Sequence, residues 1–161
     1  MRSLCGTQVL ATVLALAPGW ALAQHEHAHE HTTSEKFGKV HFPTSCKPGV
    51  QPAFEQALAL LHSFAYVRAA SVFQEISAKD PRCGMAQWGV AMTYFHIIWA
   101  PPTDDEFAAG RAAAQKAAAT GAPSARERDF IAAIGTYYQG EGVAHPARVV
   151  AYENAMAGVA D

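Results

Sequence analysis

Apolar residues recur every three or four positions through most of the chain after residue 50, which is the spacing of one face of an α-helix. The first such stretch contains Phe54, Leu58 and Leu61, and Pro52 suits the first turn of its helix. No stretch has the alternating pattern of a strand, so we expect an all-α fold. The segments predicted to be helical span residues 52–65, 68–79, 84–96, 104–119, 125–138 and 146–161.

Turn and capping residues separate these segments. Pro81 ends the second predicted helix, and the proline pair at 101–102 ends the region of the third predicted helix. Thr103, followed by acidic residues at 104–106, is typical of a helix N-cap. Ser124 and Glu127 have the spacing of a capping box. Helices joined by such short turns are expected to pack as antiparallel hairpins.

The first 23 residues have the pattern of a cleaved Sec-type secretory signal: Arg2, an apolar run over 4–17, and Ala21-Leu22-Ala23 before the cleavage point. An uncleaved anchor is the alternative, although the run is short for a membrane span. We therefore expect a bacterial protein that is periplasmic or secreted. Its predicted parts are a signal peptide over 1–23, a disordered His-rich tail over 24–40, and a helical domain over 41–161, whose last helix continues to Asp161 as in a piece of a longer protein.

A period of 34 residues relates the first helices of two predicted hairpins. Ala69, Phe73 and Pro81 have the spacing found in the second helix of a tetratricopeptide repeat. We therefore predict a tetratricopeptide-like α-solenoid. A generic array of helical hairpins stays open, because the usual Trp is displaced or missing and a loop at 96–103 interrupts the second unit. The pairs related by the period are Phe54 with Trp88, Ala57 with Ala91, Leu60 with Tyr94, and His62 with His96.

Longer motifs also resemble a known group of proteins. They lie at 41–46, 54–55, 60–64, 80–86, 88–92, 96, 99–102 and 126–128. Together they resemble an uncharacterised family of exported bacterial tetratricopeptide-repeat (TPR) proteins over roughly residues 41–157. The resemblance implies a helical repeat fold, export and no established reaction. The chain departs from the family at Ala65, where an aromatic residue is usual, and at Gly84, where Ala is more common.

Composition and charge exclude some functions. Apolar residues make up 50% of the chain, and 12 Lys and Arg against 14 Asp and Glu give a net charge of −2. Because no basic stripe is present, nucleic acid is not an expected partner. The sequence lacks hydrolase, metalloprotease and phosphate-loop motifs, so we predict no catalysis by this chain.

Export affects the interpretation of the cysteines. Cys46 and Cys83 remain after the signal is removed, and in an oxidising compartment they are most simply a disulfide. The bond would close a loop of 37 residues and stabilise the fold by about 3–4 kcal/mol. A zinc site formed by both cysteines with His62 and His96 is an alternative, although this spacing matches no familiar zinc finger.

The first helices of tetratricopeptide repeats line a concave groove, and this predicts the binding residues. Aromatic and Met side chains there suit an apolar peptide or a partner helix. The alternative is that these side chains form the core. His62 and His96 would be neighbours in this groove and could contact a ligand or share a metal. The alternative is that both are ordinary polar groups that form hydrogen bonds with their surroundings. The predicted groove residues are Phe54, Leu58, His62, Trp88, Met92, Phe95 and His96.

The tail has its own candidate chemistry. His25, His27, His29 and His31 alternate with other residues, so two or three imidazoles could bind one Zn²⁺, Cu²⁺ or Ni²⁺ ion weakly. A solvated tail without a role is the alternative. We predict an exported scaffold that binds a peptide or protein partner, requires no cofactor and has no membrane span after cleavage. Two alternatives are an envelope metal-binding protein that uses the His tract, and an accessory subunit whose chemistry lies in further repeats.

Overall fold

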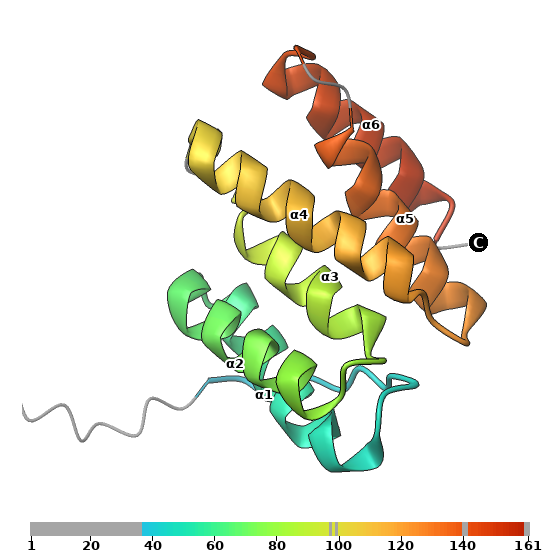
Figure 1. Ribbon diagram of the computed structural model, residues 1–161. Coiled ribbons are helices and arrows are strands. Elements are labelled where there is room, and N and C mark those ends of the chain that lie inside the picture. Colours follow the sequence, from blue (N-terminus) through green and yellow to red (C-terminus); the bar gives the residue numbers. More distant parts are fainter. Residues whose placement is uncertain (1–36, 97, 99, 140–141, 160–161) are drawn as a thin grey trace, which may run out of the picture. The chain divides into compact units, whose positions relative to one another are not determined.

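A computed structural model describes residues 37–159 except 97, 99, 140 and 141; the predicted signal and the His tract lie outside the described residues. Every regular element in the described part is helical, which confirms the all-α class. Figure 1 shows these elements in order. They are the 3₁₀ turn η1 (Pro48–Val50) and the helices α1 (Gln51–His62), α2 (Tyr66–Lys79), α3 (Gly84–Thr93), α4 (Asp104–Thr120), α5 (Ala125–Tyr138) and α6 (His145–Ala157).

The helices pack in the order of the chain. Each of α1 to α5 contacts the next helix, and α3 also contacts α1 and α5. The pairs α1–α2, α3–α4 and α5–α6 therefore form successive layers of one helical stack, with α3 in its middle (Figure 1). Its core contains Phe54, Phe73, Met85 and Ile134, which are almost fully buried.

Predicted and observed helix bounds agree within two residues, with three exceptions. The first predicted helix ends at His62, and Ala65 is instead the N-cap of α2. The third predicted helix ends at Thr93 rather than at residue 96. The prediction that the last helix continues to Asp161 is wrong, because α6 ends at Ala157 and Gly158 caps it.

The two predicted N-caps differ in detail. Thr103 and Glu106 form a complete capping box at the start of α4. Ser124 accepts a hydrogen bond from the Glu127 amide, but the Glu127 carboxylate does not return to the Ser124 backbone. It is instead buried, with 1% of the residue exposed, and it accepts hydrogen bonds from the backbone amide and the hydroxyl of Ser45. The capping box predicted from Ser124 and Glu127 is therefore only half formed.

Residues 37–50 form a strap along the helices. Phe37 and Val40, which belong to the predicted disordered tail, pack against the helical core. Gln51 donates to the Phe42 carbonyl and accepts from Thr44, which holds the strap against the start of α1. The strap adds a layer of side chains that covers one side of α1 and α3.

Candidate functional site

Most of the predicted groove residues are buried. Phe54, Leu58, Trp88 and Phe95 have at most 8% of their surface exposed, and Met92 is half-buried against the core. In this structure their side chains therefore offer little or no surface to a ligand. His62 is exposed at the end of α1, and His96 is half-buried beyond the end of α3.

The strap and two later helices explain this burial. The Phe42 ring lies 5.8 Å from the Phe54 ring and 6.1 Å from the Trp88 ring, and Phe130 of α5 completes the cluster. Phe95 contacts the rings of Tyr137 and Tyr152 at 4.6 and 4.4 Å. The surface predicted to bind a peptide is thus covered by the chain's own aromatic residues.

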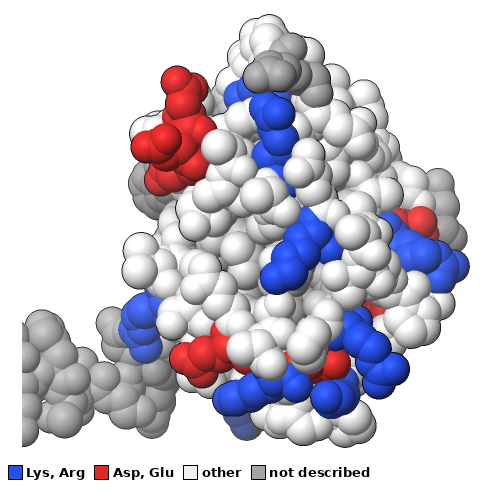
Figure 2. Space-filling model, viewed as in Figure 1, with Lys and Arg blue, Asp and Glu red and all other residues white. Residues whose placement is uncertain are grey.

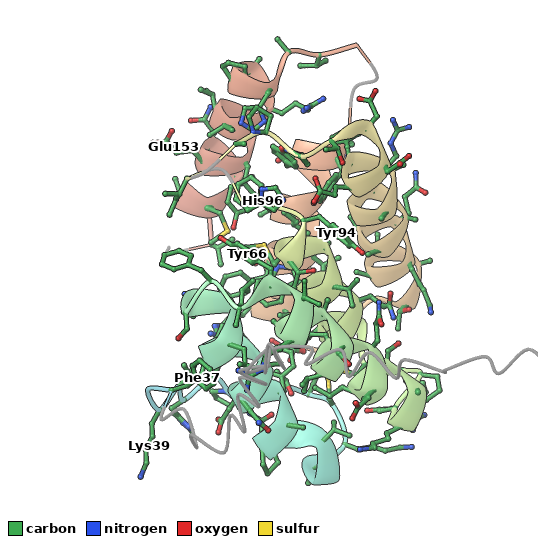
Figure 3. All side chains as sticks on the ribbon, turned by 90° about the vertical axis from the view of Figure 1, so that its left-hand side faces the viewer. Phe37, Lys39, Tyr66, Tyr94, His96 and Glu153 are labelled. Carbon is green, nitrogen blue, oxygen red and sulfur yellow. A yellow bond between two sulfur atoms is a disulfide. The ribbon has the colours of Figure 1, made fainter. Side chains whose placement is uncertain are left out.

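A different groove lies between α2 and the far end of α3, with a volume of about 490 Å³. Tyr66, Tyr94 and His96 line it and lie together in the middle of the face drawn in Figure 3. Of the seven predicted groove residues, only His96 lines this site. The remaining lining residues are Val67, Ala70, Ser71 and Gln74 of α2, Thr93 of α3 and Glu106 of α4.

The polar end of the groove is a histidine–glutamate pair. The His96 Nδ1 atom lies 3.1 Å from the Ala100 carbonyl oxygen, and because a carbonyl only accepts, Nδ1 carries a proton. The Nε2 atom lies 3.6 Å from the Glu106 carboxylate and attracts it when the ring is fully protonated. Hydrogen bonds from the Thr103 amide and hydroxyl lower the pKa of Glu106, and His96 lowers it further. Glu106 therefore gives the groove a negative charge at neutral pH.

The apolar end of the groove is exposed. Val67 in the first turn of α2 has 86% of its surface exposed, and Phe64 just before that helix has 49% exposed. The Phe64 backbone has φ 61°, in the left-handed region that favours glycine. Hydrogen bonds from the Phe64 and Ala65 amides to the Leu61 and Leu60 carbonyls hold it there. A strained aromatic residue beside a groove is a reason to suspect a binding role.

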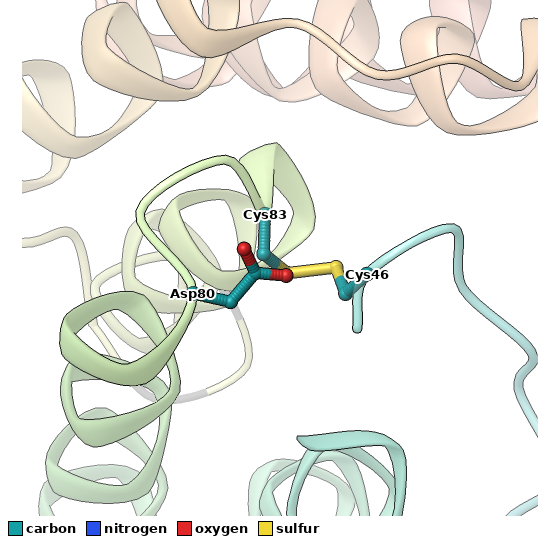
Figure 4. A group of neighbouring side chains, drawn as sticks. All are labelled: Cys46, Asp80 and Cys83. Atoms are coloured by element: carbon teal, nitrogen blue, oxygen red, sulfur yellow. A yellow bond between two sulfur atoms is a disulfide. The ribbon is translucent and has the colours of Figure 1, made fainter. Parts of the chain in front are cut away.

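The predicted disulfide is confirmed. Cys46 and Cys83 are bonded, with their Cα atoms 4.9 Å apart. The Asp80 carboxylate lies beside the bond (Figure 4) and accepts a hydrogen bond of 2.8 Å from the Lys47 amide. The three side chains are close enough to surround a metal ion, but the paired sulfurs are not thiolates. The predicted zinc site with His62 and His96 is therefore not formed in this oxidised structure.

Sequence reasoning missed most of the groove. The 34-residue period marked Tyr94 as a packing residue of the repeat, and Glu106 was assigned to the first turn of a helix. Tyr66 had no signal, because it starts a helix that was predicted to begin two residues later. Among the contacts found within the described residues, none joins the exposed His62 to His96.

Comparisons with known proteins add no relative. No protein-family model matches the chain, and neither the curated proteins nor the solved structures contain a significant match. Within the described part of the chain, no helix combines the length and the apolar character needed to cross a membrane.

Proposed function

We propose that this protein is an exported scaffold of tetratricopeptide-like helical hairpins that binds a peptide segment of a protein partner. The observation that carries the proposal is the groove lined by Tyr66, Tyr94 and His96, with exposed apolar side chains at one end. Such a surface can hold apolar peptide side chains while its polar groups bond to the peptide backbone. We assign the chain no reaction of its own.

The repeat interpretation is supported by burial at equivalent positions. Ala57 in α1 and Ala91 in α3, which are 34 positions apart, are both fully buried. Ala69 and Phe73 in α2 are likewise fully buried. Hairpin stacking requires small residues at positions such as 57, 69 and 91 and a large residue at a position such as 73.

Export is supported by the predicted signal together with the Cys46–Cys83 disulfide, since such bonds persist in oxidising compartments.

The groove proposal predicts the chemistry of the ligand. Tyr66, Tyr94 and Val67 favour aromatic or aliphatic peptide side chains, while Glu106 favours a nearby basic residue over an acidic one.

A selection from a displayed random-peptide library on the mature protein, residues 24–161, tests this proposal. We expect enriched peptides with two or more large apolar residues and few acidic ones. Their amide chemical-shift changes on the ¹⁵N-labelled protein should lie on α2, the end of α3 and the start of α4. Enriched peptides that shift residues elsewhere, or no enrichment at all, would count against the groove.

A second proposal rests on the His tract at 25–31. Alternating imidazoles suit borderline divalent ions, so the tail would act as a weak metal buffer beside the scaffold. Calorimetry with Zn²⁺ on the mature chain and on a chain that starts at Phe37 tests it. Stoichiometric binding only by the longer chain supports the tail. Equal binding by both chains would place the metal in the helical domain.

A further inference from the structure

A second, larger pocket lies at the opposite end of α2, where three loops meet around the disulfide. Its volume is about 690 Å³. The strap contributes Cys46 and Lys47, the turn between α2 and α3 contributes Asp80 and Arg82, and the turn between α4 and α5 contributes Gly121. Arg128 in the first turn of α5 completes the lining. The proposed peptide groove does not include any of these residues.

The pocket concentrates positive charge on a chain whose net charge is −2. Three exposed basic residues line the pocket, namely Lys47, Arg82 and Arg128. Its one lining acid, Asp80, is buried, with 3% of its surface exposed. The Asp80 carboxylate also accepts the Lys47 amide hydrogen bond. Figure 2 shows several Lys and Arg side chains in the lower part of the view, with a few Asp and Glu side chains among them. The accessible part of the pocket therefore carries a positive potential.

The Arg128 guanidinium is held in place by the protein. Its Nη1 atom donates to the Ala122 carbonyl at 3.1 Å and to the Pro123 carbonyl at 2.6 Å. These bonds use both hydrogens of Nη1, and the donors on Nε and Nη2 remain for a ligand. That edge of an arginine binds two oxygens of an anion at once, and holding it in advance reduces the entropy lost on binding.

Lys47 lines the pocket from a strap that several contacts hold in place. The Lys47 ammonium lies 3.4 Å from the Lys79 carbonyl oxygen, which leaves donors for another partner. The Cys46–Cys83 bond and the Lys47–Asp80 hydrogen bond hold the strap to the turn before α3. The Ser45–Glu127 hydrogen bonds hold the same strap to α5. Reduction of the disulfide would break the covalent cross-link between the strap and the turn before α3.

We propose that this pocket binds a phosphoryl group. Three cations from three segments suit a tetrahedral dianion, whose oxygens point in several directions, better than a carboxylate, whose two oxygens lie in one plane. The pocket volume exceeds that of free phosphate, so the group can belong to a larger molecule such as a sugar phosphate or a lipid headgroup. The intact disulfide favours this binding because it helps to keep Lys47 in the pocket.

Titration of the oxidised, ¹⁵N-labelled mature protein with inorganic phosphate at low ionic strength tests the proposal. We expect saturable shifts at residues 45–48, 80–83 and 120–128. The affinity should rise between about pH 6 and 8, because inorganic phosphate loses its second proton about one pH unit above a phosphate monoester. Sulfate, which is a dianion throughout this range, should bind with little change. Absence of saturation, or shifts spread over all basic residues, would overturn the site.

Matched variants separate a built site from general charge attraction. Arg82→Ala and Arg128→Ala should each weaken phosphate binding about tenfold. Arg128→Lys should also weaken it, because lysine keeps the charge but loses the two-oxygen contact. Lys116→Ala removes an exposed cation of α4 outside the pocket and should have almost no effect. Equal weakening by Lys116→Ala and Arg82→Ala would contradict the proposal.

Two further arms identify the source of the phosphoryl group and the role of the disulfide. Sedimentation with vesicles of phosphatidylcholine containing phosphatidic acid would show a lipid source if Arg82→Ala abolishes it. Binding of phosphate without vesicle binding would indicate a soluble source. A reductant should weaken phosphate binding in the wild-type chain. Unchanged affinity after complete reduction would overturn the part of the proposal that concerns the disulfide.

Discussion

The buried carboxylate of Glu127 accepts hydrogen bonds from both the backbone amide and the hydroxyl of Ser45, which lies 82 positions earlier in the chain. This contact joins the strap to α5 and complements the disulfide, which joins the strap to the turn before α3. A charged acceptor without its donors, or donors without their acceptor, is costly when buried. The pair is therefore expected to stabilise the fold substantially.

Glu127→Ala should lower the free energy of unfolding by about 2–4 kcal/mol, because the Ser45 donors lose a charged acceptor and the helix loses packing. Urea unfolding followed by circular dichroism measures this difference. Asp129→Ala removes an exposed acid of the same helix and should change the free energy by less than about 0.5 kcal/mol. Similar losses in both variants would mean that the Ser45 contact contributes little.

Gly84 lies where the fold leaves no room for a side chain. A Cβ atom at this position would overlap the carbonyl oxygen of Gly121, the residue that caps α4. Gly84→Ala should therefore destabilise the protein by about 1–3 kcal/mol despite the better helix propensity of alanine. Gly135→Ala in α5 meets only a distant side-chain atom and should stabilise by up to about 1 kcal/mol. Thermal unfolding of both variants tests the pair, and a stable Gly84→Ala variant would contradict the close approach.

His145 makes stability depend on pH. Its Nδ1 atom lies 3.0 Å from the Tyr137 hydroxyl, and burial lowers its pKa, with a smaller contribution from Arg148. The unfolded chain takes up the proton near the ordinary pKa of about 6.5, whereas the folded chain resists it. Stability is therefore complete above that pH and decreases as the pH falls below it. Between pH 7.5 and 5.5 the unfolding temperature of the wild type should fall more than that of His145→Gln; parallel curves would refute this.

Phe64 tests whether backbone strain serves binding. Glycine tolerates φ 61° without strain, so Phe64→Gly should leave the free energy of unfolding unchanged or raise it by up to about 1 kcal/mol. The same change removes an exposed aromatic ring beside Tyr66 and should weaken the binding of selected peptides severalfold. Chemical denaturation and fluorescence anisotropy provide the two readouts. Loss of stability together with unchanged peptide binding would show that Phe64 is a structural residue.

Local sequence signals predicted the helices well, because caps such as Thr103 and breakers such as Pro81 act within a few residues. The disulfide followed from export and from the number of cysteines. The covering of Phe54 and Trp88 by Phe42 could not be predicted, because it depends on the path of a proline-containing segment that has no periodic pattern. For the same reason the capping-box spacing at Ser124 correctly marked a helix start, while the Glu127 side chain bonds to that distant segment.

The burial of most predicted groove residues could not be predicted for a related reason. Periodicity identifies which residues share a helix face, but it does not show whether the next layer or solvent covers that face. Here the strap covers the face of α1 and α3 that carries the aromatic residues, and the side of α2 beside Tyr94 stays open.

The most direct test of the scaffold account is the affinity of a selected peptide for two matched variants of α2. Ser71 lines the groove and Ala78 is an exposed residue of the same helix outside it, so arginine at either position adds the same charge and bulk. By fluorescence anisotropy, Ser71→Arg should weaken binding about tenfold or more, whereas Ala78→Arg should leave the wild-type affinity nearly unchanged. Equal affinity of both variants for the peptide would contradict binding in this groove.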